Sequence, residues 1–309
     1  MESKQIVKWI IKALIAVVIL LVIVIAAVVL PAHLQVRSVA SALPGNSELL
    51  ALRGANGPSK VSYIVTSSQQ LNRGQISHIS IVVEWPNGKR FLIDTGMSKP
   101  EAENFAKLLK KMDSSAGSAT VHTTISEALG SEINEIAGVG FTHLHSDHTQ
   151  GIENFCALRG PGAVLLQTRS QRDLHNFNTT GGAELLTKSC LERFDLSPEG
   201  SANLSASSDF PGVAAFELGG HTPGSTLWAV SIGDKVLLFS GDITNDKASI
   251  EHDIGKPIIY SYLLVPENTK RTLELRRWLN QLDKKDQFSV IVSHDLANTR
   301  SHLPEFTIE

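Results

Sequence analysis

The segment FTHLHSDHTQG (residues 141–151) constrains this chain more than any other stretch of its sequence. It places His143, His145, Asp147 and His148 within six positions. Neutral imidazole and carboxylate groups are natural ligands of zinc in proteins. In an extended loop His143 and His145 lie on one side and can share a metal, whereas Asp147 and His148 point toward a second one. The fold must bring further ligands to this loop.

Helices and strands alternate along the chain after residue 60, which predicts an α/β (or α+β) fold of layered sheets and helices. Hairpins are predicted at 78–96, turning at Pro86-Asn87-Gly88, and at 226–242, turning at Gly233-Asp234. We predict helices from Pro100 and over 269–285, strands at 162–167, 213–221 and 288–295, and loops with short helices over 170–210.

Several polar side chains directly follow predicted strands. Asp94, His143, His221, Asp242 and His294 each stand just beyond the carboxyl end of one. Ligand sites of layered folds tend to lie along the edge where strands end. We therefore expect these five residues to converge.

A long apolar segment near the N-terminus predicts a membrane-spanning helix. Residues 13–30 contain no polar side chain, and with 9–11 the span reaches the roughly 20 residues that a helix needs to cross a bilayer. Lys4, Lys8 and Lys12 precede it, so the positive-inside rule places the N-terminus in the cytoplasm and the rest outside, on the periplasmic or extracellular face. We predict a cytoplasmic stub and signal anchor over 1–31, a linker over 32–60 and a globular domain over 61–309.

Two alternatives stay open around this topology. A cleaved signal peptide competes with the anchor, because Ala40-Ser41-Ala42 resembles a cleavage site. Outside the cytoplasm Cys156 and Cys190 can form a disulfide, although two free buried thiols are an equal alternative.

The net charge of −3 comes without a basic block, so no nucleic-acid partner is expected and a small-molecule substrate is favoured. Oligomeric state leaves no signal in the sequence.

The motifs together resemble those of the metallo-β-lactamase-fold hydrolases. These motifs are HxHxDH, a Gly-His-Thr-Pro-Gly run, a Ser-Gly-Asp and a late Ser-His, in that order between residues 143 and 294. The resemblance covers about residues 61–295. It implies a four-layer αββα sandwich, here preceded by one transmembrane helix.

The resemblance also implies a role for each matching residue. A first metal would be held by His143, His145 and His221. A second would be held by Asp147, His148 and His294. Asp242 would bridge the two metals, and Asp94 would orient a ligand histidine by a hydrogen bond. Zinc is the expected metal, with iron or manganese possible from the same ligands.

The chemistry implied is metal-dependent hydrolysis of a small ester or lactone by a metal-bound hydroxide, with Asp147 or Asp242 relaying the proton. True β-lactamases of this fold typically lack an aspartate at the position that matches Asp242, which argues against β-lactam hydrolysis. A glyoxalase II-like thioesterase and a phosphodiesterase are alternatives. A mononuclear iron sulfur dioxygenase and a non-catalytic metal-binding scaffold also remain open.

Other residues receive weaker assignments. Tyr260 or Tyr262 can donate to an oxyanion, although plain packing is favoured for each. Asp295 is interpreted as a helix cap or as a carboxylate behind a ligand, without a choice. Ser225 and Gln150 depart from the family pattern and are expected to reshape the pocket without changing the ligands. The remaining histidines of the globular region have no motif context and are expected to be structural: His78, His122, His175, His252 and His302.

Overall fold

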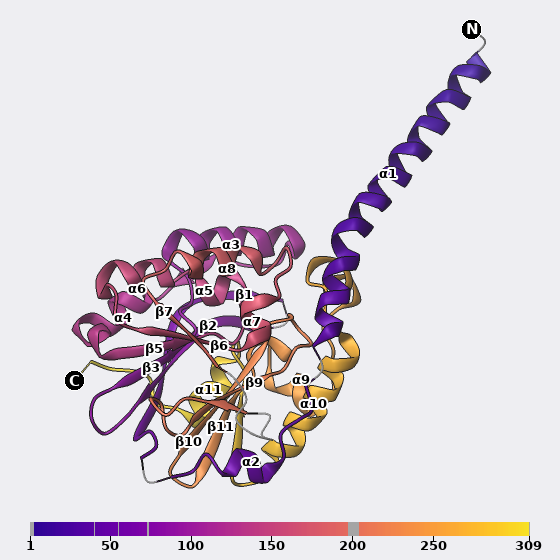
Figure 1. The fold of residues 1–309 in the computed structure, drawn as a ribbon. Coiled ribbons are helices and arrows are strands. Elements are labelled where there is room, and N and C mark those ends of the chain that lie inside the picture. Colours follow the sequence, from indigo (N-terminus) through magenta and orange to yellow (C-terminus); the bar gives the residue numbers. More distant parts are fainter. Residues whose placement is uncertain (1–2, 40, 55, 73, 197–203, 309) are drawn as a thin grey trace.

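The computed structural model describes residues 3–39, 41–54, 56–72, 74–196 and 204–308. Two β-sheets lie face to face, and helices cover the outer side of each (Figure 1). The predicted αββα sandwich is confirmed.

Within the described residues the first sheet is mixed and has seven strands, and the second has five. The order in the first sheet is β4 (Ala119–Val121), β1 (Lys60–Leu71), β2 (Gly74–Glu84), β3 (Arg90–Ile93), β5 (Ile136–Gly140), β6 (Val164–Gln167) and β7 (Glu192–Asp195). Strands β2 and β3 form the predicted hairpin, and β3, β5, β6 and β7 run parallel to one another. Because they run parallel, β3 and β5 end at the same edge.

Strand β1 was not predicted from the sequence, although it is the longest of the described strands. Its second half is polar, so hydrophobic alternation gives no signal there. These polar side chains are nevertheless buried and paired: Ser67 Oγ lies 2.9 Å from His78 Nδ1, and Gln69 Nε2 donates to the carbonyls of Ala106 and Gly117.

The second sheet has five strands, in the order β12 (Phe288–Ile291), β11 (Lys235–Phe239), β10 (Thr226–Ile232), β9 (Val213–Glu217) and β8 (Ser205–Ala206). Strands β10 and β11 form the second predicted hairpin. Strand β9 is antiparallel to β10, and β12 is parallel to β11, so β9, β11 and β12 all point the same way.

Helices pack on the outer faces through two further apolar clusters. On the first sheet these are α4 (Ile125–Leu129), α6 (Ile152–Arg159) and α8 (Thr180–Thr187), beside α3 (Lys99–Met112). On the second they are α2 (Asn46–Leu50), α9 (Lys247–Glu251) and α10 (Thr269–Asp283). Helices α3 and α10 were both predicted. The short elements are α5 (Ser146–Thr149), α7 (Arg169–Asp173), α11 (Leu296–His302), η1 (Gly130–Glu135), η2 (Gly241–Ile243) and η3 (Tyr260–Leu264).

Helix α1 (Ser3–Ser38) projects from the domain (Figure 1). Among the described helices it is the one long and apolar enough to cross a membrane, and this apolar part is fully exposed. Its length and composition suit an anchor and a signal sequence alike. Ala40, part of the candidate cleavage site, lies outside the described residues.

Several described residues within the predicted linker, 32–60, pack on the domain. Helix α1 continues through Pro31, and Ala32, Val36 and Val39 are buried against the domain. Helix α2 follows, with Leu49 fully buried. The scattered polar residues of this stretch masked its apolar pattern in the sequence, although Leu43, Leu49 and Leu52 pack in the apolar cluster on the second sheet.

The structure also resolves the question of the two cysteines. Cys156 on α6 and Cys190 after α8 form a disulfide, with their Cα atoms 5.4 Å apart. The bond joins α6 to the segment that follows α8, on the outer side of the first sheet.

The two sheets are in direct contact just before the histidine loop. The ring of Trp228 on β10 packs against Phe91, with centroids 5.0 Å apart, and its Nε1 donates to the carbonyl of Phe141. A Cβ added to Gly140 would lie 2.2 Å from this indole. Glycine at that position therefore lets the second sheet press against the strand that leads into the loop.

This contact predicts that Gly140→Ala is destabilising. The indole is held by its hydrogen bond and cannot retreat freely, so we expect the free energy of unfolding to fall by about 1–3 kcal/mol in urea denaturation. Gly181→Ala is the matched control, because nothing lies within 4 Å of its added Cβ. Equal stability of the two variants would contradict this description of the interface.

Candidate metal centre

The strand ends converge as the sequence predicted. Asp94 follows β3, His143 follows β5, His221 follows β9, Asp242 follows β11 and His294 follows β12. These strands share one direction within each sheet, so their carboxyl ends form a common edge. The remaining members, His145, Asp147 and His148, come from the loop and from α5, which directly follows His145.

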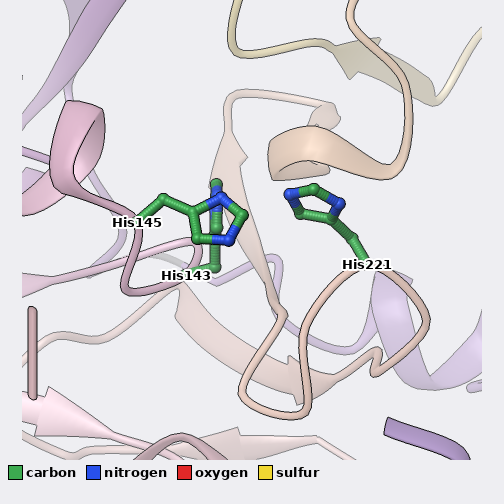
Figure 2. A group of neighbouring side chains, drawn as sticks. All are labelled: His143, His145 and His221. Carbon is green, nitrogen blue, oxygen red and sulfur yellow. The ribbon is translucent and has the colours of Figure 1, made fainter. Parts of the chain in front are cut away.

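The candidate ligands form two groups. His143, His145 and His221 make up the first, and their rings face one another (Figure 2). Asp147, His148, Asp242 and His294 make up the second. Within each group the ligand atoms all lie within 4.8 Å of one another, which is the spacing expected around a single metal ion.

Asp242 lies between the two groups. Its Oδ2 is 3.0 Å from His294 Nε2 and 3.9 Å from His221 Nε2, and its Oδ1 is 3.4 Å from His148 Nε2. One carboxylate is thus within reach of cations in both groups.

The chemistry of this donor set fits metal ions. The Nε2 atoms of His145, His148 and His221 and the Oδ1 of Asp242 are buried and have no hydrogen-bond partner among the described residues. Unpaired buried polar atoms are costly. Four such atoms aimed at one small region are explained by cations that accept their lone pairs.

Carboxylates behind two of the histidines fix how their rings point. Asp94 Oδ2 accepts a hydrogen bond of 2.8 Å from His148 Nδ1, and Asp94 also binds the backbone N–H and hydroxyl of Thr142. Glu267 Oε1 accepts one of 2.6 Å from His221 Nδ1. In both cases the Nδ1–H bond turns the Nε2 lone pair toward the site.

Asp94 is held in an unusual backbone conformation. Its φ is +60°, in the left-handed region that non-glycine residues seldom adopt. Its backbone N–H donates to the carbonyl of Gly140, and its carboxylate spans the loop to Thr142. Strain of this kind concentrates at functional sites, where the surroundings enforce it.

Burial keeps key imidazoles neutral, as metal ligands must be. Burial lowers the pKa of His145 to about 3 and holds the pKa of His143 well below its usual range. In the second group burial also opposes charge on His148, but Asp94, Asp147 and Asp242 raise its pKa well above the usual value. This excess of negative charge attracts a cation.

Three residues of the site were missed or assigned otherwise from sequence. His78 on β2 was expected to be structural, yet its buried Nε2 lies 3.8 Å from Asp147 Oδ2 and has no hydrogen-bond partner among the described residues. Glu267 and Lys256 were not singled out. Lys256 Nζ donates to the carbonyl of Asp242 and lies 3.4 Å from Glu267.

Glu267 is ionised in this setting. Burial alone raises its pKa, but Lys256 and the hydrogen bonds from His221 and Ser261 lower it to about 2. No motif marks position 267. Alternation in β2 groups His78 with Ser80, opposite the core residues Ile79 and Ile81, so no signal in the sequence marks His78 either.

The other weak assignments are now placed. Asp295 is a helix cap: its Oδ1 accepts from Asn298 N at the start of α11. Tyr260 lines the cavity over the site, whereas Tyr262 does not. The hydroxyl of Ser225 accepts from Thr222 N, and Gln150 ends α5. Six histidines lie in neither ligand group: His33, His78, His122, His175, His252 and His302.

A cavity of about 340 Å³ opens over the second ligand group. Asp147, Asp242 and His294 are among its lining residues. The apolar part of its wall comes from α3, through Phe105, Leu108, Leu109 and Met112, and from the η3 region, through Tyr260, Leu264 and Val265. A polar reaction centre thus lies beside a largely apolar wall.

Known proteins share this fold. A model of the metallo-beta-lactamase superfamily matches residues 73–286. An N-acyl homoserine lactone hydrolase, solved with N-hexanoyl-L-homoserine at its catalytic metal center, is 17% identical with a TM-score of 0.57, over 80% of this chain and 98% of that one. A mutant of the B. thuringiensis enzyme AiiA, solved with N-decanoyl-L-homoserine, is 17% identical with a TM-score of 0.58, over 80% of this chain and 98% of that one.

The dizinc quorum-quenching lactonase AidC is 16% identical with a TM-score of 0.50, over 77% of this chain and 89% of that one. At these identities the likeness shows the fold. Among curated proteins none matches the sequence. The family match covers more than half of the chain and includes all the candidate ligands except His294. The chain therefore belongs to the metallo-beta-lactamase superfamily, and its His/Asp centre is that of a metal-dependent hydrolase.

Proposed function

We propose that this protein is a dinuclear hydrolase, with zinc as the expected metal, that opens small esters or lactones. The observation that carries the proposal is the pair of ligand groups joined by one carboxylate. His143, His145 and His221 would hold one ion, Asp147, His148 and His294 would hold the other, and Asp242 lies within reach of both. When bound, such a pair supplies an activated water nucleophile and a Lewis acid for the substrate carbonyl.

The chain's own residues perform the remaining tasks. Burial alone raises the pKa of Asp147, but His148 and His294 lower it below its usual value, so this carboxylate is ionised at neutral pH. Asp147 and Asp242 both line the cavity and are placed to accept a proton and pass it to the leaving alkoxide.

Tyr260 is suited to bind the oxyanion. Burial, together with Asp242 and Glu267, raises the pKa of its phenol well above the usual value. The hydroxyl therefore stays protonated at neutral pH and can donate a hydrogen bond to negative charge that develops on the substrate.

The apolar wall favours substrates with an acyl or other apolar arm. Leu108 and Met112 on α3 and Leu264 on η3 line the cavity, whose volume of about 340 Å³ leaves room for a chain beside the reacting carbonyl. The N-acyl homoserines bound in two structural neighbours have this shape. With α1 as an uncleaved anchor, the domain works at the outer face of the cytoplasmic membrane.

Hydrolysis of a lactone tests this proposal. The metal-loaded protein is expected to hydrolyse N-hexanoyl homoserine lactone or a short p-nitrophenyl ester, to lose activity in a chelator and to regain it with zinc. His143→Ala should lower kcat/KM by about 1,000-fold, because the ion loses a ligand. His252→Ala, at an exposed histidine, should change little.

The same assay separates the alternatives. Preference for a thioester or for bis(p-nitrophenyl) phosphate would keep the hydrolase and reassign its substrate. Activity that survives the chelator, or oxygen uptake with a persulfide substrate, would contradict the proposal.

Glu267 and Asp94 each orient a histidine of a different ligand group, so substituting them should weaken the binding of different ions. Glu267→Gln should weaken the ion of the first group by about 10–100-fold, because His221 loses its orienting partner, and Asp94→Asn should do the same to the ion held by His148. Metal competition with a chromophoric chelator measures both affinities. Glu274→Gln, at a half-exposed position on α10, is the control. If both substitutions weaken the same ion, the division into two groups is wrong.

A further inference from the structure

The domain carries a concentrated patch of exposed apolar side chains, here called the apolar rim. It consists of Ile258, Ile259, Tyr262 and Leu263 from the η3 region, with Leu108 and Met112 from α3. Ile258 is 77%, Ile259 68% and Leu263 51% exposed. Exposed apolar side chains scattered singly are normal, but a contiguous patch marks an interaction surface.

The rim lies at the level where the membrane-spanning part of α1 ends. The apolar run stops at Leu30, and the ring nitrogen Nε2 of His33 lies 3.1 Å from the carbonyl oxygen of Tyr262. The two rings also pack, with centroids 5.4 Å apart. Three residues of helix rise about 5 Å, so η3 sits roughly one helical turn from the bilayer surface.

The connection between α1 and the rim is built of packed residues. Helix α1 is continuous from Ser3 to Ser38, and Ala32 and Val36 are buried where it meets the domain. The helix therefore fixes the height of the rim above the membrane. A free linker would not do so.

The same two elements form both the rim and the wall of the cavity. Leu108, Met112 and Leu264 line the cavity that reaches Asp242 and His294, while Ile259 and Leu263 stand outside it. The mouth of the cavity consequently opens within the rim. Lys107, Lys110 and Lys111 are exposed on α3 beside it, where cations suit lipid headgroups.

We propose that the apolar rim rests on the membrane that α1 spans, and that the site takes its ester substrate, an amphiphile with an acyl chain, from that membrane. The contact with lipid stands on the geometry of α1 and the rim. The substrate class rests in addition on the proposed hydrolase function.

Spin labelling of the full chain in phospholipid vesicles tests the contact. Both native cysteines are paired, so a single introduced cysteine is the one free thiol. A nitroxide at Ile259→Cys should collide more often with oxygen than with a water-soluble nickel chelate. The control is Ile308→Cys, half-exposed near the C-terminus on the side away from α1, which should show the opposite preference (Figure 1).

Two results would overturn the contact. One is a label at position 259 that, like the label at position 308, collides more often with the nickel chelate than with oxygen. The other is shielding from both reagents or dipolar broadening between labels, which would show that a protein or a second copy of this chain covers the rim.

Activity tests the substrate class. The double variant Ile259→Ser/Leu263→Ser removes two rim residues that do not line the cavity. In this variant the rate of hydrolysis of a long-chain ester embedded in vesicles should fall at least 10-fold, whereas the rate on a short soluble ester should change little. The control variant Ile308→Ser should hydrolyse both esters at the parent's rate. Equal loss on both esters would overturn the membrane source. If the parent hydrolyses neither ester, the proposed function and this substrate class both fall, while spin labelling still decides the contact.

Discussion

Burial of so many ligand atoms around one point is the constraint on which the rest of the structure depends. Imidazoles and carboxylates lose their hydration there, and several of their atoms have no partner among the described residues. Such an arrangement is unfavourable unless cations pair with it. The sandwich offsets this cost by fixing the ligands at strand ends and on the loop that leads into α5, and by backing His148 and His221 with carboxylates.

The frame beneath the site explains how this geometry is maintained. Gly140 lets Trp228 pack against the strand that leads to the loop, and the indole binds the carbonyl of Phe141, two residues before His143. Both sheets are thereby held together directly under the ligands. Helix α1 is joined to this frame, since it enters the domain as packed helix and meets η3, which is part of the cavity wall.

The sequence predicted the parts of this account that local pattern controls. Both hairpins, α3, α10 and the convergence of the strand ends followed from alternation, turn residues and motifs. Strand β1 was missed because Ser67 and Gln69 gain their partners only after folding. Glu267 lies 46 residues from His221, and His78 reaches Asp147 through strand register, so neither contact leaves a local trace. The disulfide likewise depends on how α6 and α8 dock on the sheet.

The most direct test of the central claim is metal content per chain, measured on the purified full-length protein and on Asp242→Ala. The account predicts two divalent ions in the parent protein and the loss of at least one in the variant, because Asp242 lies within reach of both groups. A single ion in the parent, no tightly bound metal, or two ions retained after the substitution would contradict a carboxylate-bridged pair.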